Sequence, residues 1–171
     1  MRTVRRANLT DADALGSVEV RAWQAVHRGR LDDEWLDGLD PAERAEAWRE
    51  ELRDPGADRE LHVVIDAGAV VGFAALGRSR DPGTTPATGE LQALFLTPEA
   101  WGRGLATELL DEVTDRLERR GFSEVTTWVP VDNERARRFY AERGWVEDGE
   151  RRTTDHDGQQ VERIRVRRPL P

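Results

Sequence analysis

Residues 94–110, LFLTPEAWGRGLATELL, hold the densest set of residues with a chemical use in this chain. Gly102 and Gly104 allow tight backbone turns with few side chains in the way, and they lead directly into a segment with helical periodicity. The free N–H groups and the dipole at the start of such a helix form an anion site suited to a pyrophosphate. A lone G-x-G also fits a turn without a ligand, and Thr107 in place of a third glycine disfavours a dinucleotide-binding fold.

The composition removes several reaction classes. All 26 basic residues are arginine, and the chain of 171 residues has neither lysine nor cysteine. A Schiff base, a Walker-type phosphate loop, a thiolate nucleophile and sulfur-ligated zinc are therefore excluded. None of the three serines lies in the G-x-S-x-G pattern of a serine hydrolase. His27, His62 and His156 lack metal-binding spacing, so no metal is expected. Acid–base chemistry, binding through backbone amides, or no catalysis remain.

The elements that position the glycine loop follow from the spacing of apolar residues. Strands are expected at 2–7, 61–66, 70–76, 90–98, 124–130, 145–152 and 160–167. Helices are expected from a cap at residues 8–11 to Gly29, and at 41–52, 105–120 and 133–143. The Gly- and Pro-rich residues 77–89 are expected to form a mobile connection within one domain. This order predicts a mixed α+β domain spanning residues 1–171.

Charge and hydropathy limit the partners. The net charge is −8, and residues 31–60 hold 12 acidic residues against four arginines, so nucleic acid is not expected as a partner. No run of 18 apolar residues exists, and the first 16 residues lack the apolar stretch of a signal peptide. We therefore expect no membrane partner and a cytoplasmic location.

The glycine loop resembles the acetyl-coenzyme A loop of the GNAT superfamily of N-acetyltransferases. That loop reads Gln/Arg-x-x-Gly-x-Gly/Ala after a strand that ends in x-Pro. Gly104 and Ala106 match this pattern, whereas Trp101 departs from the usual Gln or Arg. The departure affects only a side-chain role, because this family holds the phosphates mainly through backbone amides.

A second motif and the N-terminal region extend the resemblance. The family's Asn, followed seven residues later by Tyr and then by a Gly–aromatic pair, appears as Asn133, Tyr140 and Gly144–Trp145. Residues 21–36, RAWQAVHRGRLDDEWL, look like a large GNAT subgroup, and the resemblance covers residues 1–168. It implies the GNAT fold, a central mixed but mostly antiparallel sheet of six to seven strands flanked by about four helices.

The resemblance also implies how acetyl-coenzyme A is bound. The backbone of Leu94, Phe95 and Leu96 would pair with the pantetheine arm like an added strand, and one of their N–H groups would polarise the thioester carbonyl. The pyrophosphate would be held by the amides of the loop, namely Gly102, Arg103, Gly104, Leu105, Ala106 and Thr107. Asn133 would bond the arm, although its residue type and place also fit a helix cap alone.

Acetyl transfer to an amine requires two proton movements. For the acid we favour Tyr140, the sole tyrosine, whose phenol can donate to the departing thiolate; the alternative is a purely structural core aromatic. For the base we favour Glu90, which lies eleven residues before Trp101, the spacing of the glutamate base in several members of the family. The alternative is an exposed carboxylate at the start of a strand.

The acceptor is the least defined part of the prediction. The first two helices of a GNAT fold border the acceptor cleft, so Trp23, His27 and Trp35 are candidates to line it, although such tryptophans are more often core residues. The acidic stretch at 31–60 lies in the same region and would attract a cationic acceptor. The sequence does not identify the acceptor itself.

The prediction is therefore direct transfer of acetyl from acetyl-coenzyme A to a primary amine of a small molecule or peptide, in a ternary complex. Transfer of a longer acyl group, or transfer to a hydroxyl, stays open. A coenzyme A-binding sensor or an inactive partner subunit is the alternative without catalysis. A homodimer is also left open.

Overall fold

The computed structural model describes residues 1–56 and 58–171. The strands in this part are β1 (Arg2–Arg6), β2 (Glu60–Asp66), β3 (Ala69–Arg78), β4 (Thr88–Leu96), β5 (Glu124–Pro130), β6 (Val146–His156) and β7 (Gln159–Pro169). The helices are α1 (Ala12–His27), α2 (Asp33–Asp37), α3 (Pro41–Arg53), α4 (Leu105–Arg119) and α5 (Glu134–Ala141), with short 3-10 turns at Leu9–Asp11 and Pro98–Ala100.

The strands form one sheet in the order β1-β2-β3-β4-β5-β7-β6. All neighbours are antiparallel except β4 and β5, which run parallel. This confirms the predicted α+β fold and its mixed, mostly antiparallel sheet. About four helices were expected; the fifth, α2, lies between the first two predicted helices.

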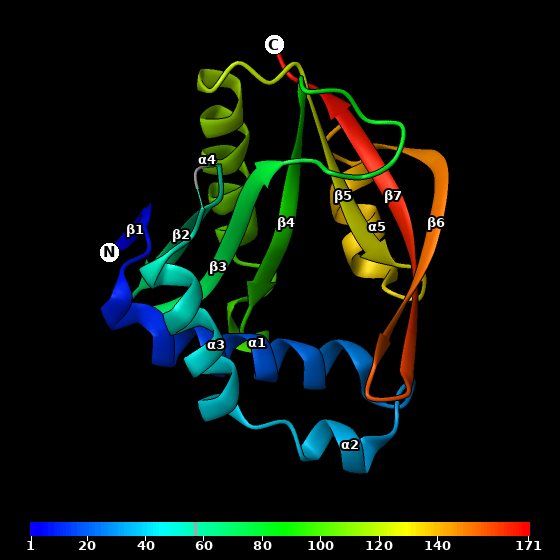
Figure 1. Ribbon diagram of the computed structural model, residues 1–171. Helices are drawn as coiled ribbons and strands as arrows, with labels where there is room; N and C mark the ends of the chain where they lie inside the picture. Colours follow the sequence, from blue (N-terminus) through cyan, green and yellow to red (C-terminus); the bar gives the residue numbers. More distant parts are fainter. Residues whose placement is uncertain (57) are drawn as a thin grey trace.

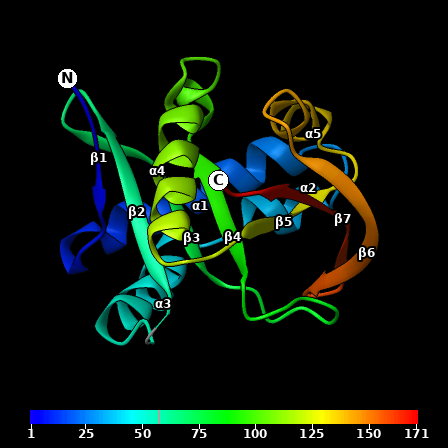
Figure 2. The same cartoon turned by 90° about the horizontal axis from the view of Figure 1, so that it is seen from above.

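Helices cover both faces of the sheet (Figures 1 and 2). One core cluster joins α4 and α5 to the central strands, and a second joins α1 and α3 to β2, β3 and β4. The predicted apolar stripe of α4 is fully buried in the first cluster, and it consists of Leu105, Leu109, Val113 and Leu117. Burial of such a stripe, rather than helix propensity alone, fixes this helix on the sheet.

The helix starts differ in how their free N–H groups are satisfied. Asn8 and Asp11 form a capping box before α1, and Asp40 caps α3 with Pro41 at the first helical position. In contrast, α4 begins after Gly104, which offers no capping side chain. No side chain therefore competes with an external anion for the amides at this start.

Two local expectations differ from the structure. Helix α2 has five residues, too short for a helical period to be visible, and the Asp32 side chain caps it by accepting from Trp35 N at 2.8 Å. Residues 79–87 are tethered rather than a free connection, since Ser79 N donates to Thr88 O at 2.9 Å and Ser79 is buried. The strand before this segment is longer than predicted and reaches Arg78, whereas the strand after it begins and ends two residues earlier than predicted, at Thr88 and Leu96.

Candidate active site

The site is built on a gap between two parallel strands. β4 and β5 pair only from Thr88 to Leu91, opposite Glu124 to Thr127, and then diverge towards α1 (Figure 1). A bulge lies at the point of divergence, because Ala75 pairs with Ala93 and Leu76 with Leu91, which leaves Gln92 as an extra residue. A cavity of about 860 Å³ occupies this gap and extends from the end of α1 to the start of α4.

The glycine loop forms one end of the cavity. Gly102 and Gly104 have positive φ angles of 70° and 81°, and a Cβ on either would meet no atom within 4 Å. Glu108 N donates to Gly104 O at 3.1 Å, but among the described residues no acceptor is recorded for the backbone amides from Gly102 to Thr107. These N–H groups and the dipole of α4 are therefore suited to binding an anion.

The side chains of the loop divide into two groups. Gly102, Gly104, Ala106 and Thr107 line the cavity. The side chain of Leu105 is fully buried beneath α4, and that of Arg103 forms an ion pair with Asp66 at 2.5 Å. Arg103 and Leu105 can therefore contribute only their backbone amides to the site.

Trp101, the residue that departs from the family pattern, has a structural contact of its own. Its Nε1 donates to Leu96 O at 3.2 Å, which fastens the loop to the end of β4. The guanidinium of Arg135 lies 3.8 Å from the centre of its ring. Arg143 donates to the hydroxyl of Thr107 at 2.7 Å. Positive charge near the loop thus comes from α5 and the turn after it, which the sequence reading missed because these arginines lie more than 30 residues away.

Tyr140 is at once a core residue and a cavity residue. It is 5% exposed, and its ring packs edge-on against Phe139 and Trp145, with ring centres 5.2 Å apart in both pairs. It also lines the cavity. Burial raises the pKa of its phenol well above the ordinary value, and a hydrogen bond with Thr127 only partly offsets this effect. The phenol is therefore protonated at every physiological pH and is available as a hydrogen-bond donor.

Asn133 caps α5, since its side chain accepts from Ala136 N at 3.1 Å. It lines the same cavity, together with Leu94, Phe95 and Leu96 of β4. The capping interaction uses the side-chain oxygen and leaves the amide nitrogen as a donor.

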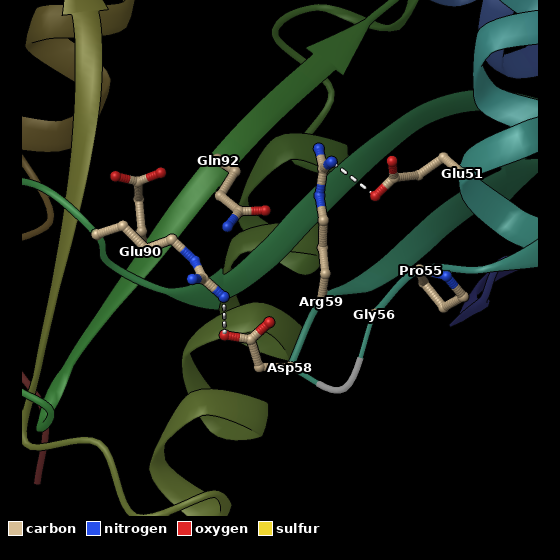
Figure 3. A pocket seen from close by; sticks show the side chains of 8 residues that line it. Glu51, Pro55, Gly56, Asp58, Arg59, Glu90 and Gln92 are labelled. Carbon is tan, nitrogen blue, oxygen red and sulfur yellow. Dashed lines mark hydrogen bonds and ion pairs between the residues drawn. The ribbon is translucent and has the colours of Figure 1, made fainter.

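Glu90 is not among the described residues that line the main cavity. It pairs with Gly77 on one side and with Thr126 on the other. It lines a second hollow, of about 640 Å³ (Figure 3), and Gln92 is a lining residue of both this hollow and the main cavity. Burial raises the pKa of the Glu90 carboxyl to about 7, and the negative charge of Asp81 adds to the shift, while Arg152 and Arg165 oppose it. A carboxyl group with this pKa can exchange a proton near neutral pH.

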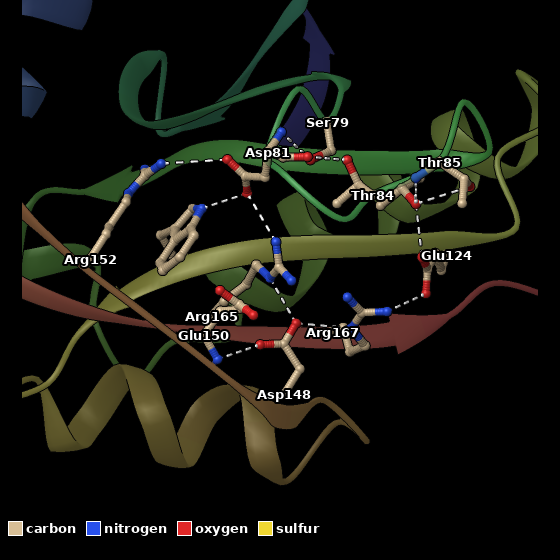
Figure 4. A network of polar contacts seen from close by, with 12 residues as sticks. Ser79, Asp81, Thr84, Thr85, Glu124, Asp148, Glu150, Arg152, Arg165 and Arg167 are labelled. Atoms are coloured by element: carbon tan, nitrogen blue, oxygen red, sulfur yellow. Dashed lines mark hydrogen bonds and ion pairs between the residues drawn. The ribbon is translucent and has the colours of Figure 1, made fainter.

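Asp81 holds the polar network beside Glu90 (Figure 4). Its carboxylate accepts from Trp128 Nε1 at 2.8 Å and lies 3.5 and 3.6 Å from the guanidinium nitrogens of Arg165 and Arg152. The sequence reading missed Asp81 because it lies in the segment expected to be mobile. Its charge favours the protonated form of Glu90, which makes Asp81 part of the environment that sets the pKa of Glu90.

The other end of the cavity is aromatic. Trp23 and His27 of α1, two of the candidate acceptor-lining residues, line this end of the cavity, with ring centres 4.6 Å apart. Trp35 does not line the cavity; it packs edge-on against Trp23 at 6.2 Å, so its predicted lining role becomes a supporting one. Two residues absent from the prediction complete this end: His156 lies 4.7 Å from Trp23, and Arg163 lines the cavity from β7.

Two further features concern other classes of function. Within residues 1–56 and 58–171, no group of three or more His, Cys, Asp or Glu side chains could hold a metal ion. In the same residues, no helix is both long enough and apolar enough to cross a membrane. The acidic stretch at 31–60 contributes no residue to the described lining of the main cavity.

The fold and the site combine diverging parallel strands, a bulge at the divergence and a helix start without a capping side chain at one end of the cavity. The acetyltransferase (GNAT) family model matches residues 22–145, and the chain belongs to this family. An uncharacterised N-acetyltransferase of Bacillus subtilis strain 168, YuaI, is 31% identical over 139 residues, which covers 78% of this chain and 74% of the relative. Another of Mycobacterium tuberculosis strain H37Rv is 31% identical over 144 residues, with 84% and 88% covered.

Solved structures agree on the fold. The PaiA N-acetyltransferase of Thermoplasma acidophilum in complex with coenzyme A has a TM-score of 0.75 at 19% identity, over 95% of this chain and 98% of that one. The yncA protein of Salmonella typhimurium with acetyl-CoA has a TM-score of 0.73 at 22% identity, over 100% and 95%. These likenesses confirm the GNAT fold expected from the sequence.

Proposed function

We propose that this protein, as a single domain over residues 1–171, transfers an acetyl group from acetyl-coenzyme A directly to a primary amine of a small molecule or peptide. One observation carries the proposal: a single cavity runs through the gap between β4 and β5, from the free amides of α4, past Tyr140, to the aromatic end at Trp23. Two reactants entering from opposite ends would meet at the divergence of the strands.

The donor is held by backbone groups at the α4 end. The amides from Gly102 to Thr107 bind the pyrophosphate, and the positive charges of Arg135, Arg138 and Arg143 around the same part of the cavity add to the attraction. The strand edge at Leu94 to Leu96 faces the gap and pairs with the pantetheine arm, and Asn133 donates to it from its free amide nitrogen. Acetyl-coenzyme A supplies the activated acetyl group.

The amine loses a proton before it attacks, and Glu90 takes that proton, directly or through a water in the hollow beside Gln92. A new C–N bond forms as the C–S bond breaks, and a backbone N–H of β4 stabilises the charge on the carbonyl oxygen. The raised pKa of Glu90 supports this role, since a carboxylate whose pKa is closer to that of an amine is a better proton acceptor.

Tyr140 acts on the departing sulfur. Its buried phenol donates a hydrogen bond that stabilises the developing thiolate. Because its pKa lies above that of a thiol, roughly 8.5, complete transfer of the proton is uphill, so the hydrogen bond itself carries most of the effect.

An amine panel tests the proposal. Purified protein, saturating acetyl-coenzyme A and each of a set of primary amines and amino acids are combined, and thiol release and the mass of the acylated product are followed. We expect amine-dependent thiol release with an increase in product mass equal to one acetyl group. Binding of acetyl-coenzyme A without thiol release across the panel would instead support a sensor or an inactive partner subunit.

A further inference from the structure

Arg163 differs from its neighbours on the same face of β7. Arg165 and Arg167 are both paired with Asp148, at 2.7 and 3.0 Å, and Arg167 also pairs with Glu124. Arg163 has no ion pair with any carboxylate among the described residues. Its recorded hydrogen bond runs from Nε to the hydroxyl of Thr154 at 3.2 Å. Both terminal nitrogens of the guanidinium are thus left without a recorded partner.

This guanidinium lies where an acceptor would enter. Arg163 is half-buried, lines the main cavity opposite Pro130, and its guanidinium carbon is 6.0 Å from the centre of the Trp23 ring. Burial, together with the nearby charge of Arg152, lowers the pKa of Arg163 to about 10, so it remains a cation at neutral pH. A half-buried cation without a counter-ion is costly, and a bound anion would remove that cost.

The surroundings of Arg163 favour an anion over a second cation. His27 is neutral at physiological pH, since burial lowers its pKa to about 4 with the positive charge of Arg163 next in effect. Arg30 also lines this end of the cavity. Asp132, which lines the cavity as well, forms no ion pair with Arg163. The two free terminal nitrogens match the spacing of a carboxylate, which arginine binds through paired hydrogen bonds.

Helix α2 contacts the turn that joins β6 to β7, and both lie near the end of α1 that carries Trp23 (Figure 1). Asp32 N donates to the side chain of Gln159 at 2.9 Å, and Trp35 Nε1 donates to Asp157 at 3.4 Å. A small molecule needs less room beside these contacts than a polypeptide chain does, so they favour a small acceptor.

We propose that the acceptor is a small amino carboxylate, whose carboxylate binds Arg163 against the Trp23 ring while its amine points towards Glu90. This inference rests on the proposed acetyltransferase function and narrows its substrate class. Arg163 is then a determinant of acceptor specificity and takes no part in proton transfer.

The test uses pairs of acceptors that differ only in the anionic group. α-, β- and γ-amino acids are each compared with the amine that lacks the carboxylate and with the corresponding aminophosphonate, with rates corrected for the fraction of free amine. For the best pair we expect the wild-type protein to prefer the carboxylate by at least 100-fold in kcat/KM. A preference for the phosphonate would contradict the carboxylate assignment.

Variants of Arg163 make the test specific. Arg163→Gln should reduce the preference at least tenfold, mainly through a higher KM for the carboxylate member of the pair, and Arg163→Lys should retain part of the preference. Arg151→Gln is the matched control, since Arg151 is exposed on β6 and paired with Glu162 at 2.8 Å. Equal kcat/KM for both members of every pair in the wild type, or an equal loss for both in Arg163→Gln and Arg163→Lys, would overturn the inference. No thiol release with any amine would overturn the proposed function itself.

Discussion

Tyr140 and Glu90 lie on different elements, α5 and β4, and burial raises the pKa of each side chain. The phenol on α5 becomes a permanent donor, while the carboxyl group on β4 becomes able to exchange a proton near neutrality. Both shifts have desolvation as their largest cause, so neither depends on a single charged partner. The two residues therefore suit opposite halves of one transfer reaction.

Replacing Tyr140 by Phe tests the donor role. The ring contacts with Phe139 and Trp145 are kept, so the fold should be retained. We expect kcat to fall roughly 10- to 100-fold, because a hydrogen bond to the developing thiolate is lost. The Kd for acetyl-coenzyme A, measured by titration calorimetry, should change less than about threefold, because the thiolate develops only during the reaction and not on binding. Unchanged kcat would remove Tyr140 from the reaction.

Replacing Glu90 by Gln tests the base. In the wild-type protein we expect kcat/KM to fall as the pH drops through about 7, since protonated Glu90 cannot accept a proton. Glu90→Gln should lose this inflection, with rates above pH 7 lower by roughly 100-fold. Glu150→Gln, a change at an exposed position on β6, is the control and should keep the wild-type profile. An inflection near pH 7 that survives in Glu90→Gln would point to another base.

At the residue scale, spacing and residue type single out Glu90, Tyr140 and Asn133 as candidate site residues, but not Asp81 or Arg163. Asp81 lies in a loop whose composition indicates only turns, and its contact with Trp128 spans 47 residues. Arg163 is one of 26 arginines. It differs from Arg165 and Arg167 only because Asp148 and Glu124 lie close enough to form ion pairs with those two residues. These ion pairs depend on tertiary structure, so the local sequence does not predict them.

At the element scale, the start of α4 is the feature that links fold to cofactor. Its two glycines adopt positive φ, and the open space beside them is where a pyrophosphate would lie. The sequence was sufficient to predict this loop and helix, because both depend on local residues. It was not sufficient for α2, whose position depends on contacts with the turn between β6 and β7 more than 120 residues away.

Gly104→Ala tests the amide site. Alanine at a φ of 81° is strained by roughly 1–2 kcal/mol, and its methyl group would enter the space assigned to phosphate. Gly68→Ala, at a φ of 82° in the turn between β2 and β3 and equally free of neighbours, carries the same strain away from the site. We expect similar losses of stability in urea for both variants, but a Kd for coenzyme A raised at least tenfold only in Gly104→Ala. Equal affinities in the two variants would contradict the site.

At the scale of the whole molecule, the cavity places titratable groups in the interior, and stability should depend on pH accordingly. His27 has a folded pKa of about 4 against an ordinary 6.5, so its contribution to stability is present above pH 6.5 and is lost as the pH falls towards 4. Glu90 acts in the opposite direction, since its raised pKa favours the folded state as the pH falls below 7. The two effects partly cancel in the wild-type protein.

His27→Phe separates the effect of His27 on the pH dependence of stability from the effect of Glu90. Phe keeps an aromatic ring against Trp23 but takes up no proton. Between pH 7 and pH 5 we expect the free energy of unfolding of the wild type to fall by about 2 kcal/mol relative to that of His27→Phe. Urea denaturation at the two pH values, without ligand, measures this difference. Parallel pH dependence in the two proteins would show that His27 is not held neutral by burial.

The most direct measurement of the central claim compares the wild-type protein with the double variant Glu90→Gln, Tyr140→Phe. Thiol release from saturating acetyl-coenzyme A is followed with and without the best amine of the panel, and Kd for acetyl-coenzyme A is measured for both proteins. We predict amine-dependent release by the wild type, release near background by the double variant, and nearly equal Kd values. Equal release by the two proteins, or no amine-dependent release by the wild type, would contradict the assignment of an amine acetyltransferase site to the gap between β4 and β5.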